Sequence, residues 1–363
     1  MNRLKLLIAS GASAGHLYPA LAFAEKLREK EANLDIAFVS SRRGGIEESI
    51  SGRGFRLFFI SVLPFSFKSF KKFFPAFFSF IRSFLESFLI IEKFRPDVVV
   101  GFGSYVSFPV LLEAALFKKA TVIHEQNVSL GLANKGLSFF VDKVAVGFKQ
   151  TENFYAKATF TGNPLGKSLR KAGKDEARRF FNLEDKFTIL TVGGSQGAHK
   201  INSEFKNSVC LIEKKEDFQF IHLTGKSDYN DLKKYYSCIT MRHRVFDFLE
   251  PMHLAYSLAD LVVSRAGAIT IAELVYFQKA ALLIPYPYAG GHQLENAYAL
   301  EKEAAAIVLR EEDLGRQRLS ETIARLIHSP LERQALEHNI QKFAVPDAAG
   351  KLAELAFSCY RKA

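Results

Sequence analysis

Three loops rich in small residues resemble phosphate-binding turns. They read GASAGH (11–16), GFGSY (101–105) and GGSQGAH (193–199), and each follows an apolar run and precedes a helix-length segment. Glycine lets backbone N–H groups approach an anion closely, and the first turn of a helix offers further unpaired N–H groups. A single loop of this kind is equally often only a tight connection. Three in one chain favour two phosphorylated ligands.

Spacing argues against several other phosphate-handling and metal-dependent enzymes. The glycine loops lack the GxGxxG spacing of a dinucleotide fold, and GNPLGKS (162–168) is one residue shorter than a P-loop. No Asp-x-Asp pair occurs, and no cluster of His, Cys and carboxylates has metal-ligand spacing. We therefore predict a reaction with neither metal nor cofactor, in which helix ends and side chains meet the charge of a departing diphosphate.

Alternating buried strands and helices would position these loops. Apolar runs alternate with helix-length segments at 5–9, 97–100, 120–124 and 143–146, and again at 187–192, 259–264 and 280–285. This pattern is typical of βα units and a parallel sheet. It restarts after the turn-rich segment TGNPLG (161–166). We predict an α/β protein of two doubly wound, Rossmann-like domains, residues 1–163 and 164–344, whose glycine loops face one cleft.

Composition limits the compartment and the partners. The 363 residues carry a net charge of +11 and include 35 Phe but no Trp, which indicates an apolar, anionic partner. Nucleic acid is the alternative, but Lys and Phe mix most strongly in one segment, which suits a membrane surface better. Cys210, Cys238 and Cys359 form no CxxC pair, so a reducing cytosol fits. The apolar run 5–9 is too short for a signal peptide and is interpreted as a strand.

Segment 65–94 combines Phe at three- and four-residue spacing with Lys and Arg. Pro75, Arg82 and Glu86 interrupt its apolar run, so we predict that it lies in the membrane interface without spanning the bilayer. The alternative is a core helix, and Phe84, Phe88 and Ile91 are predicted to pack inward. The predicted membrane contacts are Phe70, Lys71, Lys72, Phe73, Phe74, Phe77 and Phe78.

Seven groups of residues together resemble a known family. They are GASAGHLYPALA (11–22), GFGSYVSFP (101–109), HEQN with GLANK (124–135), GNP (162–164), GGSQGA (193–198), SRAGAITIAEL (264–274) and HQLENA (292–297). In this order they resemble the MurG-type transferases, which move N-acetylglucosamine from its UDP donor to undecaprenyl-pyrophosphoryl-N-acetylmuramoyl-pentapeptide. The resemblance implies the GT-B fold, an inverting reaction, and a C-terminal helix within 345–363 that returns to the first domain.

The resemblance implies that the second domain holds the donor. Glu273 resembles the carboxylate that accepts the ribose hydroxyls, although outside this motif it would be an ordinary solvated helix carboxylate. The other donor-side residues implied are Ser195, Gln196, Ala268, Ile269 and Thr270 at the diphosphate, Phe248 and Leu249 beside uracil, and His292 and Gln293 at the sugar hydroxyls.

The acceptor is expected on the first domain. The residues implied there are Ser13, Gly15, Gly103, Ser104, Tyr105, Asn127 and Asn134. We predict that His16 is the general base, because a neutral imidazole with a pKa of about 6.5 can take the proton of the attacking 4-hydroxyl at cytosolic pH. A histidine after a glycine loop is also often only a capping or packing residue.

The chain departs from the family pattern at several positions. Ala12, Ala14 and Ser104 stand where glycine is usual, Gly166 replaces an arginine, and Gly290 and Gly291 stand where a polar residue is frequent. A Cβ in the phosphate loops alters the allowed dihedral angles or limits phosphate approach. Lys167, beside Gly166, supplies only a point charge in place of a bidentate fork. A different donor affinity is therefore expected.

Two alternatives remain open. Another GT-B enzyme, such as a diacylglycerol glycosyltransferase or a UDP-sugar epimerase, is disfavoured by HEQN and GLANK. A non-catalytic membrane-binding module has no need for a ribose carboxylate. The expected partners are UDP-N-acetylglucosamine, the lipid-linked muramoyl-pentapeptide and an anionic membrane surface, and no nucleic acid. The expected location is the cytoplasmic face of the inner membrane, as a peripheral protein.

Overall fold

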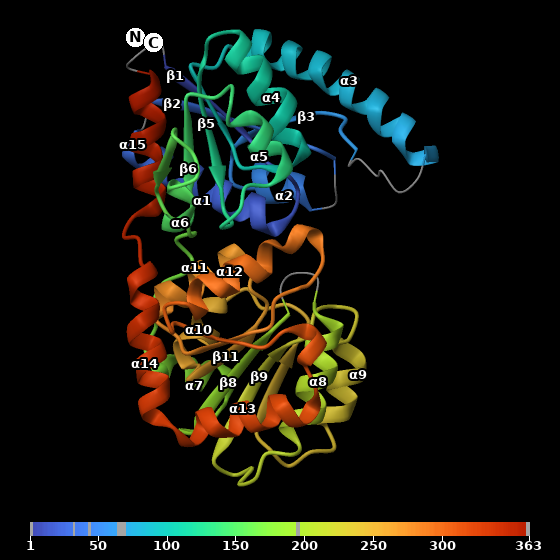
Figure 1. Cartoon of the computed structure of the whole chain (residues 1–363), viewed down its shortest axis with the longest axis vertical. Helices are drawn as coiled ribbons and strands as arrows, with labels where there is room; N and C mark the ends of the chain where they lie inside the picture. Colours follow the sequence, from blue (N-terminus) through green and yellow to red (C-terminus); the bar gives the residue numbers. More distant parts are fainter. Residues whose placement is uncertain (1–2, 32, 43–44, 64–69, 194–196, 361–363) are drawn as a thin grey trace. The chain divides into compact units, whose positions relative to one another are not determined.

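The computed structural model describes residues 3–31, 33–42, 45–63, 70–193 and 197–360. Two compact units divide the chain (Figure 1): unit 1 comprises Met1–Gly166 and Val345–Ala363, and unit 2 comprises Lys167–Ala344. Each unit is built on a parallel sheet with helices packed against it. The predicted fold class, two doubly wound α/β sheets, is confirmed.

The sheet of unit 1 has the strand order β3-β2-β1-β4-β5-β6-β7, and each neighbouring pair is parallel. The strands are β1 (Leu4–Ala9), β2 (Leu34–Ser40), β3 (Arg56–Phe59), β4 (Val98–Gly101), β5 (Ala120–Glu125), β6 (Lys143–Val146) and β7 (Ala158–Phe160). The chain order reverses between β1 and β4. The loops after these two strands therefore open at the edge where doubly wound sheets bind ligands.

Helices cover both faces of this sheet. One face carries α1 (Ala14–Lys30), α2 (Ile46–Ser51) and α15 (Ala348–Tyr360), and the other carries α3 (Phe70–Phe94), α4 (Ser104–Leu116) and α5 (Leu132–Leu137). The short helix α6 (Lys149–Glu152) lies beside β7. Continuous apolar strands such as β4, whose residues are all buried, are what a sheet covered on both faces requires.

Unit 2 repeats the pattern with the order β10-β9-β8-β11-β12-β13. The strands are β8 (Phe187–Val192), β9 (Phe218–Leu223), β10 (His243–Phe246), β11 (Leu261–Ser264), β12 (Ala281–Leu283) and β13 (Ile307–Val308). The helices are α7 (Lys174–Phe181), α8 (His199–Val209), α9 (Tyr229–Tyr236), α10 (Met252–Leu258), α11 (Ala268–Phe277), α12 (His292–Glu301), α13 (Arg316–His328) and α14 (Pro330–Ile340), with short 3-10 turns at Ala289–Gly291, Glu311–Asp313 and Gln341–Phe343. The order reverses between β8 and β11, so the ligand edge lies at the loops that follow these strands.

Helix α3 leaves many of its large apolar side chains exposed. Its buried positions include the small residues Ala76, Ser83 and Ser87, and then Ile90, Ile91 and Phe94 near its end. The two serine hydroxyls donate to carbonyls of their own helix, Phe80 O and Ser83 O, so burying them leaves no polar group unsatisfied. Ile91 is buried as predicted and Phe84 is half-buried, but Phe88 is 39% exposed, so its predicted inward packing is wrong.

Candidate active site

Two glycine loops meet at the carboxyl ends of β1 and β4 in unit 1. A Cβ on Gly11 would lie 2.5 Å from Ser104 Cβ, so the first loop passes directly over the start of α4. A Cβ on Gly103 would lie 3.2 Å from His16 Nε2 and 3.5 Å from Asn134 Nδ2. The structure therefore brings together His16, Gly103, Ser104 and Asn134, four of the residues predicted from the sequence.

His16 lies in the first turn of α1, where Ser13 holds its ring. Ser13 Oγ is 2.6 Å from His16 Nδ1. When Nδ1 carries the proton and donates a hydrogen bond to Ser13 Oγ, Nε2 is the basic nitrogen of the neutral ring. Nε2 is also the ring nitrogen nearest the Gly103 backbone. The geometry supports a base at Nε2 that Ser13 orients through the opposite side of the ring.

Ser104 occupies a backbone conformation that favours glycine. Its φ is 70°, and Gly103 before it has a φ of 79°. A non-glycine residue in this left-handed region is strained, and such strain is often kept at functional sites. The substitution for the family glycine therefore leaves the loop in its left-handed form and adds a hydroxyl group. Tyr105 and Gly15, also predicted on the acceptor side, are exposed at the starts of α4 and α1.

Glu125 organises the predicted acceptor-side asparagines, a role that sequence reasoning did not assign. One of its oxygens accepts from the Asn127 backbone N–H (3.1 Å) and side-chain amide (3.0 Å), and the other accepts from Gly131 N and Asn134 Nδ2, both at 2.9 Å. The carboxylate is buried, and four donors compensate its charge. Within the described residues, Asn134 Oδ1 is buried without a hydrogen-bond donor. It is positioned to accept one from a ligand or a water molecule.

His124, at the end of β5, links this strand to the backbone at Gly162. Its ring is buried, and Nε2 lies 3.0 Å from Gly162 O while Gln126 Nε2 lies 3.1 Å from Nδ1. A carbonyl only accepts, so Nε2–H donates and Nδ1 accepts, which fixes a neutral tautomer. Burial lowers the pKa of His124 to about 4. This histidine is a buried structural group that stays neutral.

In unit 2, five of the predicted donor residues lie after β10 or after β11. Phe248 is 58% exposed and Leu249 beside it is buried, an arrangement that leaves one ring available to a flat ligand. Ala268, Ile269 and Thr270 form the first turn of α11, where backbone N–H groups are unpaired by the helix. Ser195 and Gln196 lie outside the described residues.

Glu273 lies one turn further along α11 and is held by a residue that sequence reasoning missed. The hydroxyl of Tyr256 on α10 donates to Glu273 Oε2 at 2.7 Å. Burial raises the pKa of Glu273 to about 7, and the hydrogen bond from Tyr256 opposes that rise. The Tyr256 hydroxyl therefore engages one oxygen of this carboxylate, Oε2.

The loop before α12 positions the predicted sugar-side pair. Gly290 and Gly291 have φ values of 79° and 75°, so the two glycines that depart from the family pattern permit a left-handed turn that other residues disfavour. Gln293 Oε1 accepts from the Tyr286 N–H at 3.0 Å, so its NH2 group faces away from that contact. His292 begins α12 and is half-buried. On the same helix, buried Asn296 donates to Ala266 O at 3.2 Å, which ties α12 to the loop before α11.

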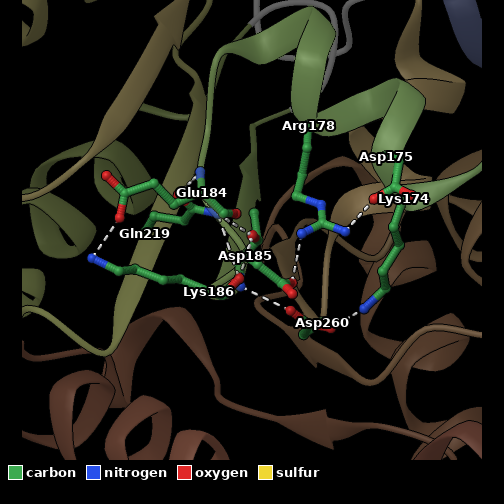
Figure 2. Close-up of polar contacts among 9 residues, drawn as sticks. Lys174, Asp175, Arg178, Glu184, Asp185, Lys186, Gln219 and Asp260 are labelled. Carbon is green, nitrogen blue, oxygen red and sulfur yellow. Dashed lines mark hydrogen bonds and ion pairs between the residues drawn. The ribbon is translucent and has the colours of Figure 1, made fainter.

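Two hollows of unit 2 lie at the amino ends of its strands. One of about 300 Å³ is lined by Lys174, Asp260 and Lys279, and another of about 320 Å³ by Arg178 and Asp185. Four of these charges form two ion pairs (Figure 2): Lys174 Nζ lies 2.6 Å from Asp260 Oδ1, and Arg178 Nη1 lies 2.9 Å from Asp185 Oδ1. These residues adjoin the amino ends of β8 and β11, away from the glycine loops, and we interpret them as structural ion pairs. Among the described residues, no group of three or more His, Cys, Asp or Glu could hold a metal.

Comparison with known proteins assigns the chain to a family. Residues 6–146 match the N-terminal domain of glycosyltransferase family 28, and residues 188–352 match its C-terminal domain. A relative from Thermodesulfovibrio yellowstonii, named UDP-N-acetylglucosamine--N-acetylmuramyl-(pentapeptide) pyrophosphoryl-undecaprenol N-acetylglucosamine transferase, is 38% identical over 99% of this chain and 100% of its own length. The chain belongs to this transferase family. A family member of the same name from Halalkalibacterium halodurans is 36% identical over 96% of this chain and 98% of its own length.

Solved structures show that this fold also occurs outside the transferase family. The crystal structure of Acinetobacter baumannii MurG matches with a TM-score of 0.79 at 24% identity, covering 98% of this chain and 99% of that one. A putative UDP-N-acetylglucosamine 2-epimerase from Listeria monocytogenes matches with a TM-score of 0.73 at 12% identity, covering 99% and 98%. The fold is thus shared with epimerases. The full-length sequence identity, and not the fold, separates the transferase family from that alternative and confirms the resemblance seen in the motifs.

Proposed function

We propose that this chain transfers N-acetylglucosamine from UDP-N-acetylglucosamine to the 4-hydroxyl of the muramoyl sugar in undecaprenyl-pyrophosphoryl-N-acetylmuramoyl-pentapeptide, with inversion and without a metal. The observation that carries the proposal is the 38% identity, over essentially the whole of both chains, to a relative named for this transfer. The site supports it, because unit 1 and unit 2 each place glycine loops and hydrogen-bonding side chains at the ligand edge of a doubly wound sheet.

On the donor side, unit 2 binds the nucleotide and stabilises the leaving group. Glu273 accepts the ribose hydroxyls, and the first turn of α11 donates N–H groups to the diphosphate. Phe248 and Leu249 flank uracil, while His292 and Gln293 read the sugar hydroxyls. As the bond from the anomeric carbon to the diphosphate oxygen breaks, its electron pair leaves with UDP, and the helix end meets the added charge.

On the acceptor side, His16 takes the proton of the attacking hydroxyl. The 4-oxygen forms its bond to the anomeric carbon from the face opposite the leaving diphosphate, which inverts the configuration, and the proton moves to His16 Nε2. Ser13 orients the ring by accepting from Nδ1. The loops at Gly15 and Gly103–Tyr105 hold the lipid pyrophosphate, and Asn127 and Asn134, fixed by Glu125, bind the acceptor.

Helix α3 attaches the protein to an anionic membrane. Phe74, Phe77 and Phe78 are exposed, as are Ile81, Leu85 and Leu89, while Ala76, Ser83 and Ser87 are buried. Figure 1 shows the amino-terminal end of α3 projecting away from the sheet of unit 1. Phe70, Lys71, Lys72 and Phe73 begin this helix, and their side chains lie outside the described residues. Exposed Phe beside Lys is the pattern of an interfacial helix on anionic lipid.

Length and composition alone do not decide between lying on the membrane and crossing it. The stretch Phe74–Phe94 is 21 residues long with a hydropathy of 1.5, long and apolar enough to cross a bilayer by these two criteria, which core helices also meet. Its packed face supports peripheral binding. Ser83, Ser87 and Ile91 are buried within unit 1, and Arg82 pairs with Glu86 at 2.8 Å, so the whole circumference of α3 is not available to lipid.

Transfer of labelled N-acetylglucosamine to a short-chain lipid-pyrophosphoryl-muramoyl-pentapeptide tests the proposal. The reaction is run with a chelator and no added metal, beside Glu273→Ala and a control, Glu301→Ala, which removes an exposed carboxylate of α12. We expect transfer by the parent and the control and strong loss in Glu273→Ala. Tight UDP binding without transfer would indicate a different acceptor. Absence of UDP binding would overturn the transferase function, and activity restored only by magnesium or manganese would overturn the metal-free chemistry.

A further inference from the structure

Tyr256 makes a contact that the proposed chemistry does not yet use. It lies on α10 with its side chain fully buried, and its ring stacks on Phe277 of α11, with ring centroids 5.1 Å apart and planes 19° apart. Its hydroxyl reaches Glu273 Oε2 at 2.7 Å. A buried hydroxyl needs a partner, and the carboxylate of Glu273 is the partner that the structure supplies.

The direction of this hydrogen bond follows from the chemistry of the two groups. An ionised carboxylate only accepts, so the phenol must donate. Burial first, and the neighbouring Glu273 second, raise the pKa of Tyr256 well above its ordinary value, so the phenol keeps its proton throughout the neutral range. Tyr256 therefore donates to Glu273 whenever the carboxylate is ionised.

The ring stacking and the hydrogen bond of Tyr256 together restrict the orientation of the Glu273 carboxylate. The Tyr256 ring cannot tilt freely, because it packs against Phe277, one turn beyond Glu273 on the same helix α11. The glutamate side chain has three rotatable bonds, and a fixed donor at Oε2 selects among their rotamers. Oε1 is then held at a set orientation relative to the first turn of α11, where the nucleotide diphosphate is expected.

We propose that Tyr256 is a positioning residue that orients Glu273 toward the two ribose hydroxyls of the donor, and so sets the preference for a ribonucleotide over a 2′-deoxyribonucleotide. This inference rests on the proposed function, in which Glu273 binds the ribose. A site built to hydrogen-bond a hydroxyl discriminates strongly against an analogue that lacks it, but only when its acceptor is held in place. Tyr256 provides that restraint from a neighbouring helix.

The test compares UDP with 2′-deoxy-UDP by calorimetry on the full-length protein. Tyr256→Phe retains the ring and its packing on Phe277 and removes only the hydroxyl. We expect the parent to bind UDP at least about tenfold more tightly than the deoxy analogue, and Tyr256→Phe to reduce this ratio to about threefold or less. The loss should come from weaker UDP binding, with deoxy-UDP affinity unchanged. In transfer assays, KM for the sugar nucleotide should rise more than kcat falls.

A matched control separates positioning from general loss of a buried hydroxyl. Tyr236→Phe removes another fully buried tyrosine hydroxyl of unit 2, whose partner is His222 Nδ1 at 3.0 Å. It should leave the ratio of the two affinities as in the parent. Both nucleotides are measured on the same preparation. A smaller folded fraction therefore lowers the number of binding sites and leaves the ratio of the UDP and 2′-deoxy-UDP affinities unchanged.

The variant Glu273→Gln distinguishes failure of the Tyr256 inference from failure of ribose binding by Glu273. If Glu273→Gln removes the preference and Tyr256→Phe keeps it in full, the positioning role of Tyr256 is overturned while ribose binding by Glu273 stands. If the parent shows no preference, or Glu273→Gln leaves it intact, ribose recognition by Glu273 is itself wrong and the Tyr256 inference fails with it.

Discussion

At the scale of single residues, the raised pKa of Glu273 makes donor binding sensitive to pH. Its pKa of about 7 means that the group passes from mostly ionised at pH 8 to mostly protonated at pH 6. The ionised form accepts both ribose hydroxyls, whereas the protonated form has lost acceptor capacity. We expect affinity for UDP-N-acetylglucosamine to fall by up to about tenfold from pH 8 to pH 6.

Equilibrium binding at constant ionic strength measures this dependence. The sugar nucleotide is a better probe than UDP, whose terminal phosphate has its own pKa of about 6. Glu273→Gln should bind more weakly and show a flatter profile, because the substituted group does not titrate. Parallel profiles for the parent and the variant would assign the pH dependence to another group.

His16 gives a second prediction at this scale. His16→Ala should lower kcat by about 10²- to 10⁴-fold, because a positioned base contributes that much to proton transfer, while KM for the donor changes little. Ser13→Ala should cost less, since Ser13 only orients the ring through Nδ1. Single-turnover transfer with saturating donor measures both. Turnover of His16→Ala within a few-fold of the parent would exclude the base role.

Sequence reasoning reached some residues of the candidate site and not others. His16 and Gly103 stand in glycine loops, and parallel strands bring such loops to one edge, so their meeting could be predicted, whereas Asn134 was expected only from the family resemblance. Glu125 and Tyr256 could not be assigned roles in this way. The function of Tyr256 depends on contact between two separate helices, 17 residues apart in sequence, and no spacing pattern signals such a contact.

At the scale of elements, α3 shows why composition alone misplaces side chains. A Phe-rich helix is normally expected to bury its rings, yet Ser83 and Ser87 lie inside and Phe78 and Leu85 lie 65% exposed. The close approach of α3 to α4 explains this arrangement, because small residues let two helices pack tightly. The rings are then left on the other face.

Substitutions on the exposed face of α3 should weaken membrane binding, and substitutions on its buried face should lower the stability of the fold. Phe78→Ser and Leu85→Ser together should weaken sedimentation with anionic vesicles by at least about tenfold and leave the thermal midpoint nearly unchanged, since both side chains are exposed. Ile91→Ala on the buried face should lower the free energy of unfolding by about 2–5 kcal/mol and leave vesicle binding of the folded protein intact.

Salt separates the charged contribution from the apolar one. Binding to anionic vesicles should weaken between low and high salt, and replacing Lys71 and Lys72 by Ser should reduce that salt dependence. Binding that is equal at both salt concentrations would exclude the electrostatic part. Full binding by the Phe78→Ser and Leu85→Ser variant would exclude α3 as the attachment surface.

The short edge strands were harder to predict than the central ones. β1, β5 and β8 each have six residues that are mostly buried, whereas β3, β7, β10 and β13, at the edges of the two sheets, have only two to four residues and are partly exposed. In runs of this length, an apolar pattern does not distinguish a strand from a loop. Only pairing with the neighbouring strand defines them.

At the scale of the whole molecule, each unit contains a buried histidine that must stay neutral. His124 in unit 1 has a pKa lowered to about 4, and His222 in unit 2 has a pKa lowered to about 3, in both cases by burial. His222 Nε2 lies 3.0 Å from Asn202 Oδ1, and Asn202 Nδ2 donates to Thr224 O, so the ring donates at Nε2 and needs no second proton. Protonation of either ring therefore favours unfolding.

Acid should destabilise both units within one pH window. The unfolded chain binds protons at histidine near pH 6.5, and the folded chain does so only near pH 4 or below, so stability falls as pH decreases from about 6.5 to 4. The free energy of unfolding should decrease by about 3 kcal/mol for each histidine. Urea unfolding at pH 7.5, 6 and 5 measures it. His124→Gln should be less stable at pH 7.5 and lose less stability on acidification, whereas His328→Gln, at an exposed position, should follow the parent profile.

The interrupted course of unit 1 has a consequence for how the protein is made. The chain leaves unit 1 at Gly166 and re-enters it at Val345, and both termini belong to this unit (Figure 1). Leu352, Ala353 and Ala356 of α15 are part of the core that α1 shares. Unit 2 is therefore synthesised whole before α15 leaves the ribosome, and unit 1 closes its core only after α15 has emerged. A premature stop that removes α15 would release a chain with a complete unit 2 and an open unit 1.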